Sequence, residues 1–82
     1  MSGKVIVLFL GPLGDLAGAE SAEFDAPLDW KGLLDAVDPA VTEQLQLDRV
    51  NVACAGKVLG DKTTLQANAG DEIALLPPVS GG

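Results

Sequence analysis

The residues best suited to covalent chemistry are the two glycines at the end of the chain, Gly81 and Gly82. A terminal carboxylate is ionised at pH 7, which makes it a poor electrophile. If another enzyme joins it to the phosphate of AMP, a sulfur or nitrogen nucleophile can displace the nucleotide. Glycine suits such a reaction because it has no Cβ and lets the last carbonyl enter a narrow active-site channel. We therefore expect the reactive atom of this chain to be the Gly82 carbonyl.

The residues before the two glycines are suited to present them to another protein. Two consecutive prolines have fixed φ angles and cannot donate to a β-ladder, so they end the preceding strand and extend the chain away from the sheet. Four extended residues beyond them span roughly 13 Å, at about 3.3 Å per residue. This length is sufficient to reach into a pocket of a neighbour. The arm that we expect to be inserted consists of Pro77, Pro78, Val79 and Ser80.

The rest of the sequence is poor in catalytic residues. It contains no histidine, the commonest base at neutral pH and the commonest transition-metal ligand. The single cysteine, Cys54, lies among apolar residues of an expected strand, so we expect it to pack and not to act as a nucleophile. The glycines at 11, 14 and 18 match no phosphate-binding motif. We expect no bound metal or cofactor and no independent catalysis.

The charge of the chain restricts its partners. Twelve acidic and five basic residues give a net charge of -7, which disfavours nucleic acids and anionic membranes and favours a basic protein surface. The same charge could equally serve solubility. The longest apolar run is too short to cross a bilayer, one cysteine cannot form an internal disulfide, and no leader pattern is found. These features predict a cytoplasmic protein.

The elements that must position the tail form an α+β pattern. Apolar residues at three- and four-residue steps predict a helix over residues 28–47, and Asp38 followed by Pro39 divides or kinks it. Residues 15–18 form a turn or one helical turn. Strands are expected at residues 4–10, 20–25, 49–55, 58–59 and 72–76. The order predicts one domain over residues 1–76, a mixed sheet with one main helix packed on one face, followed by an extended tail at 77–82.

Two of the expected strands carry more apolar residues than such a sheet requires. In a sheet that is covered on one face, apolar and polar side chains alternate along each strand. KVIVLFL and EIALLPP instead have apolar residues at the positions that face either side of the sheet. We expect part of the second face to contact a partner. The alternative is that loops cover this face, or that isolated exposed apolar side chains have no role.

The C-terminal sequence GDEIALLPPVSGG resembles the end of the MoaD family, the small sulfur-carrier subunits of molybdopterin synthase, which typically close on G-D-E-[VI]-A-[FL]-[FL]-P-P-V-[ST]-G-G. VNVACAGKVLGDKTTL and KVIVLFLGPLGDLAG are also similar to the family, so the resemblance covers nearly the whole chain. It implies a ubiquitin-like β-grasp fold. It also implies that an E1-like enzyme adenylates the C-terminus with ATP, that sulfur replaces AMP to give a thiocarboxylate, and that this sulfur passes to cyclic pyranopterin monophosphate.

The resemblance further implies partners and residue roles. The large subunit of molybdopterin synthase would accept the tail, in a heterotetramer of two small and two large subunits. Gly82 would hold the sulfur, and Gly81 would permit entry to the channel. Gly14 and Ala55 depart from the arginine and asparagine that are frequent in the family. The residues that we assign to apolar docking on the partner are Leu10, Val58, Leu75 and Leu76.

Other β-grasp proteins also end in Gly-Gly. They include the thiamine carrier ThiS, carriers for cysteine synthesis, and ubiquitin-related modifiers that are conjugated to lysines. The ending PPVSGG favours molybdopterin synthesis, because the thiamine and cysteine carriers more often lack the double proline with valine. An interaction module with an unimportant terminus is a further alternative, and it would keep its function without the two glycines.

Overall fold

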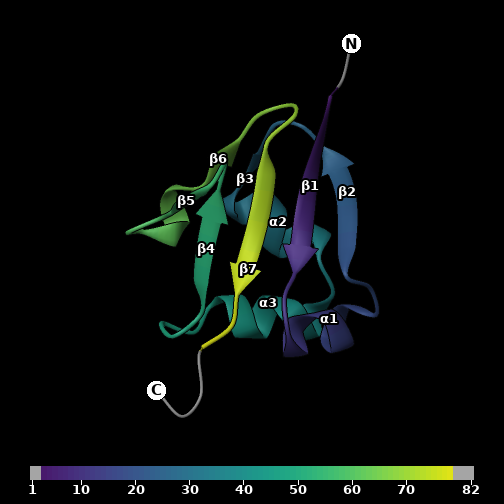
Figure 1. The fold of residues 1–82 in the computed structure, drawn as a ribbon, viewed down its shortest axis with the longest axis vertical. Coiled ribbons are helices and arrows are strands. Elements are labelled where there is room, and N and C mark those ends of the chain that lie inside the picture. Colours follow the sequence, from purple (N-terminus) through teal and green to yellow (C-terminus); the bar gives the residue numbers. More distant parts are fainter. Residues whose placement is uncertain (1–2, 79–82) are drawn as a thin grey trace.

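A computed structural model describes residues 3–78 of the chain, and its main feature is a five-stranded sheet with helices on one face (Figure 1). The strand order is β2-β1-β7-β4-β5. β1 and β7 are parallel, and the other neighbouring pairs are antiparallel. The strands are β1 (Lys4–Phe9), β2 (Ser21–Asp25), β4 (Asn51–Cys54), β5 (Lys57–Val58) and β7 (Glu72–Leu76). The expected mixed α+β sheet is therefore confirmed.

The helices and a second, small sheet complete the domain. The helices are α1 (Pro12–Ala17), α2 (Trp30–Ala36) and α3 (Pro39–Leu45), with a 3-10 turn, η1, at Lys62–Thr64. The small sheet pairs β3 (Leu28–Asp29) with β6 (Gln66–Ala67). In Figure 1 the helices lie behind the main sheet and leave its front face open. Over residues 3–78 no helix has the length and apolar character that a membrane span requires.

The helical segment expected over residues 28–47 is divided into two helices of seven residues each. Asp29 begins α2, and its carboxylate accepts a hydrogen bond from the Gly32 amide at 2.7 Å. Asp38 begins α3 in the same way, accepting from the Ala40 amide at 2.9 Å, and Pro39 occupies the first turn. The break at Asp38 and Pro39 was predicted. The start of the helical segment at residue 28 was wrong, because Leu28 pairs with Ala67 of β6 and the helix begins after its cap, Asp29.

The core lies between the main sheet and the helices. β1 and β7 each direct alternate side chains toward the helices, and the residues on that side are fully or almost fully buried. Burial of such side chains stabilises a fold by roughly 1.5 to 3 kcal/mol each. In a domain of this size they supply most of the stability. The buried residues of the two strands are Val5, Val7, Phe9, Ile73 and Leu75.

A lysine side chain makes hydrogen bonds to the segment that follows α3. Lys62 Nζ donates to the carbonyl oxygen of Leu47 and, at 2.8 Å, to that of Val50. Burial lowers the pKa of Lys62 below its ordinary value, and the nearby charge of Asp48 partly opposes this shift. The ammonium group lies 5.9 Å from the centre of the Trp30 ring. Lys62 therefore ties the turn η1 to the chain between α3 and β4.

Replacement of this lysine should destabilise the domain. Lys62→Met keeps most of the side-chain volume but leaves two part-buried carbonyl groups without this donor, which we expect to lower the free energy of unfolding by about 1 to 3 kcal/mol. Urea denaturation measures the change. The matched control is Lys57→Met in β5, where the lysine is exposed and the expected change is within about 0.5 kcal/mol. Equal stability of the two variants would contradict the role of Lys62.

Candidate functional site

The base of the C-terminal tail lies at the centre of the main sheet. β7 ends at Leu76, between β1 on one side and β4 on the other. Pro77 is half-buried and Pro78 is exposed. Because neither proline can donate to a ladder, the chain leaves the sheet at this point. The remaining predicted tail residues, Val79, Ser80, Gly81 and Gly82, lie outside the described residues, so their assigned roles stay predictions.

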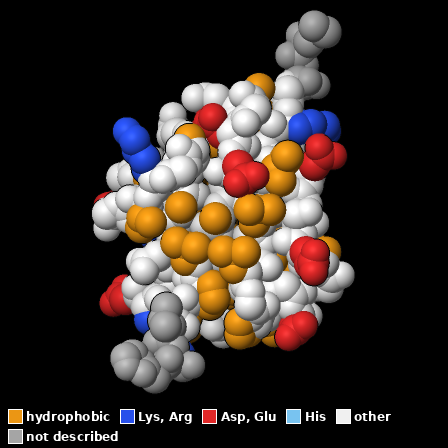
Figure 2. All heavy atoms as spheres, in the orientation of Figure 1, with side chains coloured by type: hydrophobic (Ala, Val, Ile, Leu, Met, Phe, Trp, Pro, Cys, Tyr) orange, Lys and Arg blue, Asp and Glu red, His pale blue; other side chains and the backbone are white. Residues whose placement is uncertain are grey.

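The face of the sheet that points away from the helices is apolar. The register places Leu8 of β1, Ala74 of β7, and Ala53 of β4 in one row across the sheet. Figure 2 shows apolar side chains gathered over β4, β7 and β1. We call this surface the outer face. It consists of Ile6, Leu8, Leu10, Ala53, Val58, Ala74 and Leu76.

Three of the four residues assigned to docking are accessible on the outer face. Val58 is 61% exposed and Leu10 is 39% exposed, and Leu76 is half-buried next to the tail. The assignment of Leu75 was wrong, since its side chain is fully buried and packs in the core. Ile73 and Leu75 share one side of β7, so Leu76 must point to the other. The sequence could not settle this parity because both leucines are apolar.

Acidic groups border the outer face at the end that lies away from the tail. Glu23 of β2 and Glu72 of β7 are the register partners of Ile6 on its two sides. Lys4 is paired with Asp25 at 2.5 Å. This hydrogen bond and its charge raise the pKa of Lys4 and lower that of Asp25. The outer face thus combines an apolar centre with acidic neighbours (Figure 2), which suits a partner surface that is apolar with basic residues around it.

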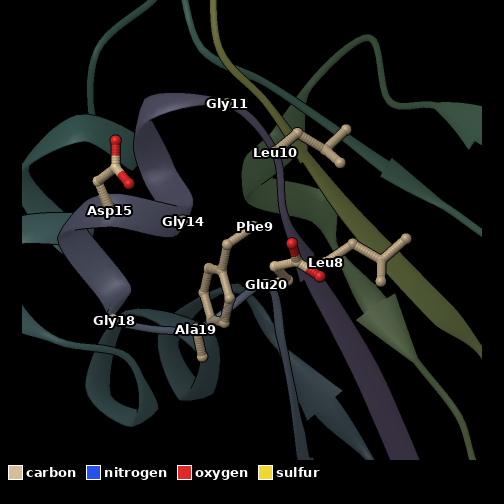
Figure 3. Close-up of a pocket in the computed structure, with 9 residues that line it drawn as sticks. All are labelled: Leu8, Phe9, Leu10, Gly11, Gly14, Asp15, Gly18, Ala19 and Glu20. Carbon is tan, nitrogen blue, oxygen red and sulfur yellow. The ribbon is translucent and has the colours of Figure 1, made fainter.

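A hollow of about 730 Å³ adjoins the outer face near α1 (Figure 3). Its walls come from the end of β1, from α1 and from the segment that leads to β2. A Cβ on Gly14 would lie 3.1 Å from the carbonyl oxygen of Phe9, so glycine permits the close approach of α1 to β1. Leu8 and Leu10 line both the hollow and the outer face. This hollow was not predicted from the sequence, because its walls come from segments that only the fold brings together.

The surroundings of the Cys54 thiol disfavour its reactivity. Cys54 is partly buried in β4 and packs against the core. Burial raises the pKa of its thiol, and the charge of Asp71 raises it further. The fraction of reactive thiolate at neutral pH is therefore small. Among residues 3–78 no group of three or more cysteine and carboxylate side chains is placed to hold a metal ion.

A mixed sheet wrapped over helices, with its last strand in the centre and a tail leaving from that strand, defines a ubiquitin-like β-grasp protein. The ThiS family model matches residues 7–82, and the chain belongs to this family. The family comprises ubiquitin-like sulfur carriers and protein modifiers. The resemblance to MoaD-type carriers is thus confirmed at the level of the shared fold family.

Solved structures agree with this assignment. The crystal structure of SAMP1 from Haloferax volcanii has a TM-score of 0.76 and 28% identity, and the match covers 98% of this chain and 100% of that one. The solution structure of small archaeal modifier protein 1 (SAMP1) from Methanosarcina acetivorans has a TM-score of 0.73 and 25% identity, over 100% of this chain and 99% of that one. No curated protein has a sequence that matches this chain.

The assignment of residues to the two faces of the sheet can be tested by stability. Leu75→Ala removes a fully buried side chain and should lower the free energy of unfolding by about 2 to 5 kcal/mol. Leu10→Ala changes a side chain on the outer face and should cost less than about 1 kcal/mol. Urea denaturation of both variants gives the comparison. A larger loss for Leu10→Ala than for Leu75→Ala would mean that the faces are assigned incorrectly.

Proposed function

We propose that this chain is the sulfur carrier of molybdenum cofactor biosynthesis, acting as the small subunit of molybdopterin synthase. The observation that carries the proposal is the ending GDEIALLPPVSGG, in which the central strand β7 passes directly into the double proline, followed by Val-Ser and the two glycines. Membership of a family of ubiquitin-like carriers supports the carrier chemistry. The particular pathway follows from the resemblance of the ending to that of MoaD-type subunits.

The proposed chemistry takes place at Gly82. An E1-like enzyme transfers AMP from ATP to the carboxylate of Gly82 and releases pyrophosphate. A sulfur nucleophile then attacks the carbonyl and AMP leaves, which gives a thiocarboxylate. The large subunit of the synthase would bind this tail and transfer its sulfur to cyclic pyranopterin monophosphate. The chain itself binds no cofactor in this scheme, and ATP is bound by the activating enzyme in the cytoplasm.

The outer face supplies the docking surface in this proposal. Leu10, Val58 and Leu76 are accessible beside the base of the tail, and they would be covered by the large subunit. The same surface would face the E1-like enzyme during activation, so the two partners would bind in turn. The acidic residues around it would favour partners with basic residues at the edge of the contact.

Conjugation to other proteins is the second candidate function. It is favoured by one observation, that two solved structures with 25% and 28% identity to this chain are those of small archaeal modifier proteins. A modifier would be activated in the same way, but a lysine amine would displace the nucleotide in place of sulfur. The two candidates therefore share the adenylation step and differ in the nucleophile that follows.

Intact-mass spectrometry distinguishes sulfur transfer from no reaction. The protein is mixed with ATP, a cognate E1-like enzyme and a sulfide source, and we expect the mass to rise by the difference between one sulfur and one oxygen atom. Cys54→Ser should gain the same mass, because in this proposal the Gly82 carbonyl and not the thiol accepts the sulfur. A variant without Gly81 and Gly82 should gain nothing. Sulfur attached to the truncated variant would contradict the proposal.

Denaturing gel blots of cells that express the tagged protein separate the two candidates. A carrier should migrate as a single band, whereas a modifier should give a ladder of conjugates that disappears without Gly82. Absence of a thiocarboxylate together with such a ladder would favour the modifier function.

An added residue tests the steric requirement at the terminus. One alanine after Gly82 should abolish adenylation, because its Cβ lies where the narrow channel must close around the reactive carbonyl. Thermal unfolding should be unchanged, since the addition lies beyond the domain. Adenylation of the extended chain with the extra residue still attached would contradict the expectation.

A further inference from the structure

Gly11 adopts a backbone conformation that other residues rarely take. Its φ is 56° and its ψ is -134°, the values of the first central position of a type II′ turn. The amide of Leu13 donates to the carbonyl oxygen of Leu10 at 3.2 Å and closes this turn. A side chain at Gly11 would be strained here whatever space surrounds it. The turn ends β1 and begins α1.

Gly11 also lies against the first residue of the tail. A Cβ built on Gly11 would lie 3.3 Å from Cγ of Pro77. This approach follows from the register, because Phe9 pairs with Leu75 in the parallel ladder and both strands end shortly afterwards. At this level β1 turns into α1, whereas the chain after β7 leaves the domain (Figure 1).

The Gly11 backbone is a firm support for the Pro77 ring. The amide of Gly14 donates to the carbonyl oxygen of Gly11 at 3.0 Å, and Pro12 restricts the next φ angle. Pro77 has no amide hydrogen, so packing must replace the ladder hydrogen bond that another residue would make here. The close approach of Gly11 is therefore a restraint on the Pro77 ring at the point where the chain leaves the sheet.

We infer that Gly11 is a positioning residue that sets the direction in which the tail leaves the domain. The inference rests on the proposed function only in that Gly82 is the residue that reacts. A side chain at Gly11 would push the Pro77 ring by a few tenths of an ångström and so change the angle at which the tail leaves, while the apolar side chains of the outer face stay in place. Docking on the activating enzyme would then be unchanged, and delivery of the terminus into its active site would be impaired.

Steady-state kinetics of adenylation test this inference. ATP–pyrophosphate exchange is measured with the E1-like enzyme at varied concentrations of the full-length chain. We expect Gly11→Ala to lower kcat at least about tenfold, since small misplacements of a reacting group are costly, and to leave KM within about twofold. The control is Gly18→Ala, which also has a positive φ, 74°, but whose added Cβ would meet nothing within 4 Å. We expect its kcat and KM to stay within about twofold of the original values.

A double-mutant cycle separates this role from general destabilisation. Pro77→Gly removes the ring and should lower kcat by itself. Gly11→Ala should then lower kcat little further in the double variant, because the ring that it would push is absent. In the control cycle, the effects of Gly18→Ala and Pro77→Gly on kcat should be additive. A nuclear Overhauser contact between the Gly11 α-hydrogens and the Pro77 ring in the unmodified protein shows the packing directly. If Gly11→Ala fails to fold, the Pro77→Gly variant still tests the inference. An unchanged kcat for Pro77→Gly would overturn it.

The outcomes distinguish the inference from the proposed function. Suppose that the unmodified chain is adenylated. If the kcat of Gly11→Ala is then unchanged, or if the losses of kcat in Gly11→Ala and Pro77→Gly are additive, the inference is wrong and the proposed function stands. If the unmodified chain is not adenylated by any cognate E1-like enzyme, the proposed function is wrong and the inference is refuted with it.

Discussion

The central position of β7 is the constraint on which the rest of the structure depends. Its backbone is hydrogen-bonded to β1 on one side and to β4 on the other, so the strand cannot fray as an edge strand does. The tail therefore starts from a strand that is paired on both sides up to Leu75. Pro77 and Pro78 end the ladder abruptly because they have no amide hydrogen. This arrangement fixes the point of departure of a segment whose terminal atoms, in our account, react in another protein.

The two faces of the same strands have different tasks. One side chain in two points toward the helices and supplies the core, and the others form the apolar outer face beside the tail. The acidic side chains of Glu23 and Glu72 lie next to Ile6 at one end of this face, and in our account they complement basic residues of a partner. In our account, one sheet therefore supplies both the core and the docking surface.

The sequence was a good guide where a local physical rule determines the structure, and a poor one where long-range pairing does. The strands and the break at Asp38 and Pro39 follow from side-chain pattern and capping, and they were predicted. β3 and β6 were missed because they are two residues long and, unlike β5, do not pair with a neighbouring strand across a tight turn. The parity of Leu75 and Leu76 depends on register, and the approach of Gly11 to Pro77 depends on two segments far apart in the chain. Such contacts cannot be read from one sequence.

The central claim is that the terminal Gly82 carbonyl carries sulfur for molybdopterin synthesis, and complementation tests it most directly. A strain that lacks its own small subunit of molybdopterin synthase receives either the full chain or a chain without Gly81 and Gly82, together with the cognate partner proteins. The account predicts that the full chain restores molybdoenzyme activity and that the truncated chain, though folded and expressed to the same level, does not. Restoration by the truncated chain would contradict the account.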